Sequence, residues 1–158
     1  MNRTSMAEWL ASSHPEPDQV WAEWRDRGVA VIPLGPQYGA VRIPEAVVYA
    51  AAESSDPDDV GVVLAQALDG PVIHDARGRN FYMLVRSDTL VDWGRTVAGV
   101  EQLGPRTHLG VPASNRCENS PHTPVYWAVP GLRPGHCDPN AVGLLIRRGA
   151  ELLSEAAR

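Results

Sequence analysis

Short apolar runs separated by Gly and Pro indicate strands along much of the chain. The first run, Val29–Leu34, is continuous and rich in β-branched residues, which predicts a central strand covered on both faces. Pro33 predicts that this strand ends or bulges there. The runs that predict about six strands are Val29–Leu34, Ala40–Ile43, Val72–His74, Phe81–Val85, Thr107–Val111 and Val125–Val129.

Apolar positions spaced three or four residues apart, with capping residues before them, predict about five helices. In the segment opened by Pro17, the residues Val20, Trp21 and Trp24 share one face, so we expect both indoles to dock on the core. A short capped turn at 5–10 precedes this helix. The other predicted helices are 44–52, 57–68, 87–93, which Ser87 would cap, and a closing helix at 138–157.

The element order predicts a single compact domain of the α/β (α+β) class over residues 1–158. Its sheet should be mixed or mostly antiparallel, with about six strands flanked by helices. Residues 72–85 form the clearest hairpin. The expected organisation is N-terminal helices at 1–27, a sheet core at 28–130 and the C-terminal helix at 138–157.

The formal net charge of −5 disfavours nucleic acid as a partner, because such binding depends on neutralising phosphates. All fourteen basic residues are Arg. A protein partner or self-association fits this charge better. No apolar run is long enough to span a bilayer, and the start lacks the apolar core of a secretory signal. We therefore expect a cytoplasmic protein, with no membrane partner and with reduced cysteines.

Candidate catalytic residues gather around one strand end. His74 and Asp75 end a buried strand, where α/β sheets often present reactive groups, and His108 lies in another strand. One hypothesis places these three residues around a cleft, with Arg77 and Arg79 binding an anion. The alternative is that both histidines are hydrogen-bonded structural groups and both arginines are surface charges. There is no G-x-S-x-G elbow to supply a serine nucleophile.

Four side chains have donor atoms suited to zinc, namely Cys117, His122, His136 and Cys137. Their spacing, C-x4-H followed by adjacent H-C, matches no standard zinc knuckle, so we expect no metal. A disulfide between the two cysteines is conceivable, but a reducing compartment argues against it. The phosphate-binding motifs G-x-x-x-x-G-K-[ST] and G-x-G-x-x-G are both missing from the sequence, and we expect no cofactor.

The strand at 125–129 carries two aromatic residues that point to opposite faces, Tyr126 and Trp127. Trp127 and the preceding His122 are candidate ligand contacts, since aromatic side chains stack on bases or anchor interfaces. For Trp9, a place in the core and a role in contacting a ligand or partner are equally compatible with the sequence.

The segment Gly28-Val29-Ala30-Val31-Ile32-Pro33-Leu34, after a helix ending in Trp24–Arg27, resembles the opening of the bifunctional primase/polymerase N-terminal domain. The segments Thr107–Pro112 and His122–Trp127 look like the closing strands of that family. The resemblance spans about residues 20–130 and implies a compact α/β domain around a mixed sheet.

Polymerisation in that superfamily requires a D-x-D or D-x-E pair that holds two divalent metals. The candidate strands here, Ala40–Ile43 and Val72–Asp75, lack such a pair. The resemblance therefore implies a non-catalytic binding or regulatory module on this scaffold. Two alternatives stay open: a small enzyme or ligand-binding protein using a His74/Asp75/His108 cleft, and a homodimeric interaction protein.

Overall fold

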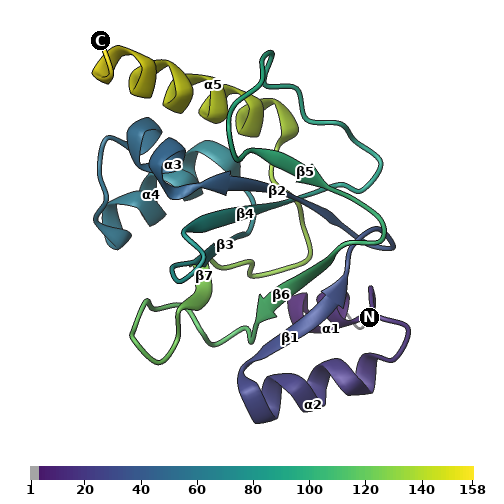
Figure 1. The fold of residues 1–158 in the computed structure, drawn as a ribbon. Coiled ribbons are helices and arrows are strands. Elements are labelled where there is room, and N and C mark those ends of the chain that lie inside the picture. The colour runs from purple at the N-terminus through teal and green to yellow at the C-terminus, as the bar shows by residue number, and fades with distance from the viewer. Residues whose placement is uncertain (1–3) are drawn as a thin grey trace.

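A five-stranded antiparallel sheet forms the centre of the structure, which is a computed structural model describing residues 4–158 (Figure 1). Its strand order is β5-β2-β4-β3-β7, and a separate antiparallel pair joins β1 to β6. The strands are β1 (Val29–Pro33), β2 (Gly39–Pro44), β3 (Val72–Asp75), β4 (Asn80–Val85), β5 (Glu101–Leu103), β6 (His108–Pro112) and β7 (Val125–Val129).

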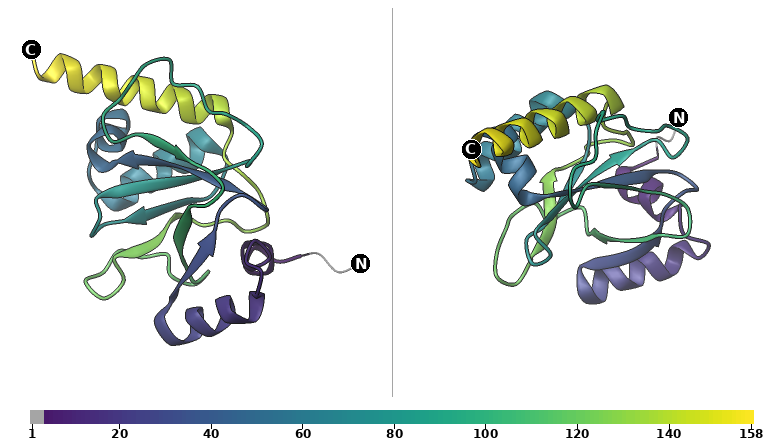
Figure 2. Two further views of the ribbon diagram at one scale, coloured as in Figure 1. Left: turned by 45° about the vertical axis from the view of Figure 1, so that its right-hand side comes forward. Right: turned by 45° about the horizontal axis from the view of Figure 1, so that its top comes forward.

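Five helices cover the strands on two sides (Figures 1 and 2). They are α1 (Met6–Ala11), α2 (Pro17–Arg27), α3 (Glu45–Ala52), α4 (Pro57–Leu68) and α5 (Pro139–Ala156). None of the helices within residues 4–158 has the length and hydropathy of a membrane-spanning segment. Residues 1–3 of the predicted N-terminal helical segment lie outside the described residues.

Each face of the five-stranded sheet belongs to its own hydrophobic core. Side chains alternate along a strand, so β4 directs Phe81, Met83 and Val85 to one face and Leu84 to the other. The first face packs against α3, α4 and α5. The second packs against α1, α2 and the β1–β6 pair. The α+β class, with a mostly antiparallel sheet flanked by helices, is thereby confirmed.

Helix α5 lies close to its neighbours because two of its buried positions are Gly. A Cβ at Gly149 would overlap the carbonyl oxygen of Val47 in α3 and lie 2.8 Å from Val47 Cγ1. A Cβ at Gly143 would overlap the carbonyl oxygen of Asp92. The side chain of Asp138 caps the helix by accepting from the Asn140 backbone N–H at 3.0 Å. These contacts fix α3 between α5 and the sheet.

The helix predicted at 87–93 is wrong, because this segment is irregular and precedes the unpredicted strand β5. The reason lies in one side chain. The Gln102 amide oxygen accepts from the Val91 backbone N–H at 2.8 Å, and its amide nitrogen donates to the Thr89 carbonyl at 2.7 Å. Backbone groups that a helix would pair internally are therefore satisfied by β5.

The prediction that Val29–Leu34 is a central strand covered on both faces is also wrong. Among the residues that the structure describes, β1 pairs only with β6, and Val31 is 48% exposed while Ala30 and Ile32 are buried. Only one predicted indole of α2 docks fully. Trp24 is buried and its ring nitrogen donates to the Val111 carbonyl at 2.9 Å, whereas Trp21 is 45% exposed.

Candidate functional site

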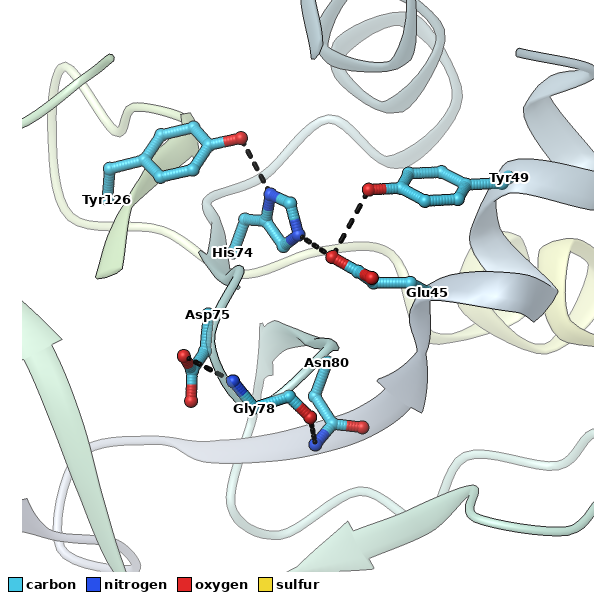
Figure 3. A network of polar contacts seen from close by, with 7 residues as sticks. All are labelled: Glu45, Tyr49, His74, Asp75, Gly78, Asn80 and Tyr126. Carbon is cyan, nitrogen blue, oxygen red and sulfur yellow. Dashed lines mark hydrogen bonds and ion pairs between the residues drawn. The ribbon is translucent and has the colours of Figure 1, made fainter. Parts of the chain in front are cut away.

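His74 lies at the centre of a buried polar network on the face of the sheet that packs against α3, α4 and α5 (Figure 3). The register of β3 places it directly opposite Phe81 of β4 on one side and Tyr126 of β7 on the other. The imidazole stacks flat on the Phe81 ring, with 4.0 Å between ring centroids and 2° between planes. His74 is only 3% exposed, so every polar contact it makes is desolvated.

Both ring nitrogens of His74 are hydrogen-bonded. Nε2 lies 2.6 Å from Oε2 of Glu45, and Nδ1 lies 2.6 Å from the hydroxyl oxygen of Tyr126. The Tyr49 hydroxyl donates to the same Glu45 oxygen at 3.2 Å. We call Glu45, Tyr49, His74 and Tyr126 the His74 network; Figure 3 shows its side chains converging from α3, β3 and β7.

The position of Glu45 follows from the local chain path. β2 ends at Pro44, and α3 begins at the next residue, so the Glu45 side chain stands where strand turns into helix. Its backbone N–H donates to the Arg79 carbonyl at 3.0 Å, which fastens the start of α3 to the β3–β4 turn. Tyr49 lies four residues later on the same helix face, within reach of the carboxylate.

The proton positions follow from the chemistry of the partners. A carboxylate only accepts, so Nε2 of His74 donates to Glu45. In a neutral imidazole Nδ1 is then an acceptor, and the Tyr126 hydroxyl donates to it. Burial, and then the nearby carboxylates Glu45 and Asp58, raise the pKa of Tyr126 to about 12. Burial and Glu45 likewise raise the pKa of Tyr49 to about 12. Both phenols keep their protons at neutral pH.

An open groove of about 710 Å³ adjoins the network along β7. Tyr126 belongs to both, because it lines the groove and bonds to His74. The groove runs between α4, β7 and the loop that carries Cys117. Its lining residues are Pro57, Asp58, Gly61, Val62, Ala65, Cys117, Glu118, Asn119, Tyr126, Ala128, Val129 and Pro130. Gly61 lets α4 approach the strand, since a Cβ there would lie 3.2 Å from the Ala128 carbonyl oxygen.

Asp75, Arg77 and Arg79 form the β3–β4 turn beside His74. The Asp75 carboxylate accepts from the Gly78 backbone N–H at 2.9 Å, which makes it a turn-forming group (Figure 3). Arg77 and Arg79 are exposed, and Arg79 has a positive φ of 60°. The turn thus connects β3, which carries His74, to β4, and within residues 4–158 its arginine side chains form no hydrogen bond or ion pair with the His74 network.

The structure does not bring His108 to His74. His108 is exposed at the start of β6, opposite Pro33, in the two-stranded sheet. His122 is exposed in the loop before β7. Trp127 is buried on the opposite sheet face from Tyr126, as predicted, and its ring nitrogen donates to the Pro112 carbonyl at 3.1 Å. The predicted His74/Asp75/His108 cleft is therefore not formed, because His74 and Asp75 lie together in β3 while His108 lies in the other sheet.

The four candidate zinc ligands are also dispersed. Cys137 is buried, and its thiol donates to the Pro71 carbonyl at 3.3 Å; burial raises its pKa to about 12. Cys117 is exposed, and both thiols are free. His136 Nε2 lies 3.3 Å from the Gln37 carbonyl oxygen, with its ring edge against Trp9. Across residues 4–158, no three His, Cys, Asp or Glu side chains come together as a metal site.

Three residues of the network, Glu45, Tyr49 and Tyr126, were not among the predicted site residues. A signal for two of them was present, because Glu45 and Tyr49 are four residues apart at a helix start. Tyr126 was placed on one face of its strand, but its nearness to His74 depends on the pairing of β3 with β7.

Comparison of the chain with protein-family models, with curated proteins and with solved structures finds no match.

Proposed function

We propose that this chain is a non-catalytic binding module, and that its ligand occupies the groove between α4 and β7. The observation that carries the proposal is the dual position of Tyr126, which lines the groove and is held by His74, itself bonded to Glu45. Binding sites gain affinity when their contact groups are locked in place by buried hydrogen bonds. The His74 network gives Tyr126 that rigidity, because the tyrosine is 4% exposed and its hydroxyl is bonded.

The proposal is tested by blocking the groove. Ala65 is an exposed α4 residue that lines it, so Ala65→Trp should fill it, while Gln66→Trp adds the same ring to an exposed position outside the lining. A set of neutral, cationic and anionic fragments is titrated into ¹⁵N-labelled protein. Shifts should cluster on groove amides, persist in Gln66→Trp and disappear in Ala65→Trp. Fragment shifts confined to other surfaces would contradict the proposal.

A second candidate, a small acid–base enzyme, is favoured by the relay from Glu45 through His74 to Tyr126. In that arrangement His74 can accept the tyrosine proton while Glu45 stabilises the imidazolium. The raised pKa of Tyr126 argues against this role, because a phenol with a pKa of about 12 gives up its proton to His74 only reluctantly near neutral pH. Turnover of a substrate that Tyr126→Phe abolishes without loss of binding would favour the enzyme.

The kinship with the primase/polymerase domain stays a prediction from the resembling segments. One feature supports a non-catalytic member. The candidate strand Ala40–Ile43 carries no carboxylate, and its one charged residue, Arg42, donates through its guanidinium to Glu101 at 2.7 Å. Extension of a primed template by the purified protein with Mg²⁺ or Mn²⁺ would contradict the proposal.

We further propose that the module acts in the cytoplasm and that a protein partner or a second copy accompanies it. The net charge of −5 supports a protein partner over nucleic acid. Light scattering on the purified chain would separate a dimer from a monomer.

A further inference from the structure

We infer that the groove binds an organic cation, an ammonium or guanidinium group carried on an apolar body. This inference rests on the proposed function and names the ligand class of the same groove. Its two charged lining residues are Asp58 and Glu118, and its lining contains no Arg or His. Carboxylates on opposite walls, one on a helix and one on a loop, leave a cation as the complementary charge.

The two carboxylates are available for a ligand. Within residues 4–158 neither Asp58 nor Glu118 has a side-chain hydrogen bond or an ion pair. The start of α4 is not a free anion site, because the Asp56 side chain already accepts from the Asp59 backbone N–H at 3.1 Å. An anionic ligand would thus meet three carboxylates in the first turn of α4 and its N-cap.

The negative field reaches the groove wall at Tyr126. Glu45 lies behind this tyrosine and Asp58 lies on the groove side, and both raise its pKa after burial does. A cation bound in the groove would interact favourably with both carboxylates.

Most of the other residues that line the groove are small and apolar. Val62 is 56% exposed, and it lines the groove together with Ala65, Pro57 and Pro130. Exposed aliphatic surface beside carboxylates fits a ligand whose cationic nitrogen is attached to a hydrophobic body. A fully hydrated inorganic cation would leave these walls without a partner.

The test is a matched series of probes titrated into ¹⁵N-labelled protein. Phenethylamine, phenethyl alcohol and phenylacetate share one body and differ in charge. We expect the amine to shift groove amides with an affinity about three- to tenfold above that of the alcohol, because each exposed carboxylate adds modest attraction. Phenylacetate should bind most weakly, and added salt should reduce the differences in affinity among the three probes.

Two variants locate the charge. Asp58→Asn and Glu118→Gln should each weaken amine binding about two- to fivefold and leave alcohol binding unchanged. Asp59→Asn is the matched control, because it removes a carboxylate from the same helix turn but does not line the groove. Arginine with its α-amino and carboxyl groups both blocked is a fourth probe. If it binds more tightly than phenethylamine, the preferred cation is a peptide side chain.

Equal binding of all three probes in the groove would overturn the cation inference while leaving the proposed groove intact. Loss of amine binding in Asp59→Asn as large as in Asp58→Asn would also overturn it, since the effect would then come from net charge alone. If no probe shifts groove amides, the inference fails, and the groove-blocking experiment decides separately whether the proposed function fails with it.

Discussion

Removing one oxygen atom, in the substitution Tyr126→Phe, should destabilise the protein measurably. The ring and its packing stay, while Nδ1 of His74 loses its partner at 2.6 Å. Because His74 is 3% exposed, water cannot easily replace the hydroxyl. An unsatisfied polar group in such a place costs about 1–3 kcal/mol. For a domain of this size, about 2 kcal/mol corresponds to a fall in melting temperature of roughly 4–8 °C.

The assay is thermal and urea unfolding followed by circular dichroism, with Tyr82→Phe as the control. Tyr82 lies on the opposite face of β4 and is half-buried, and its hydroxyl makes no hydrogen bond to the part of the chain that the structure describes. The control should change the free energy of unfolding by less than about 0.5 kcal/mol. If Tyr126→Phe were as stable as the control, the Tyr126–His74 bond would not hold the network together.

A double-mutant cycle separates the bond from other effects. In a His74→Phe background the Tyr126 hydroxyl has lost its acceptor, so adding Tyr126→Phe should be neutral or stabilising. A cost equal to that in the native background would mean that the hydroxyl acts through some other contact.

Three further predictions concern packing, alkaline pH and thiol reactivity. Gly149→Ala should lower the free energy of unfolding in denaturant titrations by about 1–3 kcal/mol, because the new Cβ overlaps a backbone oxygen of α3. This loss should outweigh the better helix propensity of alanine. Gly104→Ala is the control and should be tolerated, because open space surrounds that position. The pKa of Tyr126 rises from 10.0 to about 12 on folding, so the unfolded chain loses the phenol proton at lower pH than the folded chain. Stability should therefore fall as the pH rises from about 10 to 12, and tyrosinate absorbance should appear together with unfolding. A thiol-reactive disulfide reagent should modify the exposed Cys117 at once and the buried Cys137 only on unfolding; equal rates would contradict their placement.

Features set by neighbouring residues were predictable from the sequence. Gly and Pro punctuation and two-residue alternation place the β3–β4 hairpin and most helices, because both act within a few residues. The helix predicted at 87–93 failed because Gln102, some distance along the chain, binds its backbone. β1 was taken for a central strand because its apolar run conceals which face is exposed.

The candidate site was predictable only in part for the same reason. His74 could be singled out as a polar group ending an apolar strand. Its partners could not, because Tyr126 meets it through the register of β3 and β7, and Glu45 meets it through the packing of α3 on the sheet. His108, by contrast, looked equivalent to His74 in sequence but lies in the other sheet.

The pairing of β1 with β6 has a consequence for how the chain folds. β1 occupies residues 29–33, whereas its partner occupies 108–112, so this contact closes a very long loop. Long-range antiparallel pairing is slow compared with local hairpins such as β3–β4. During synthesis α1, α2 and β1 leave the ribosome before β6 and lack their partner until it follows.

The early segments therefore expose Ile32 and Trp24, which are buried in the finished core, for most of the elongation time. We expect the sheet with α3 and α4 to become protected first in pulsed hydrogen exchange, and the N-terminal layer last. The N-terminal layer, which is made before the sheet, would then be completed after it.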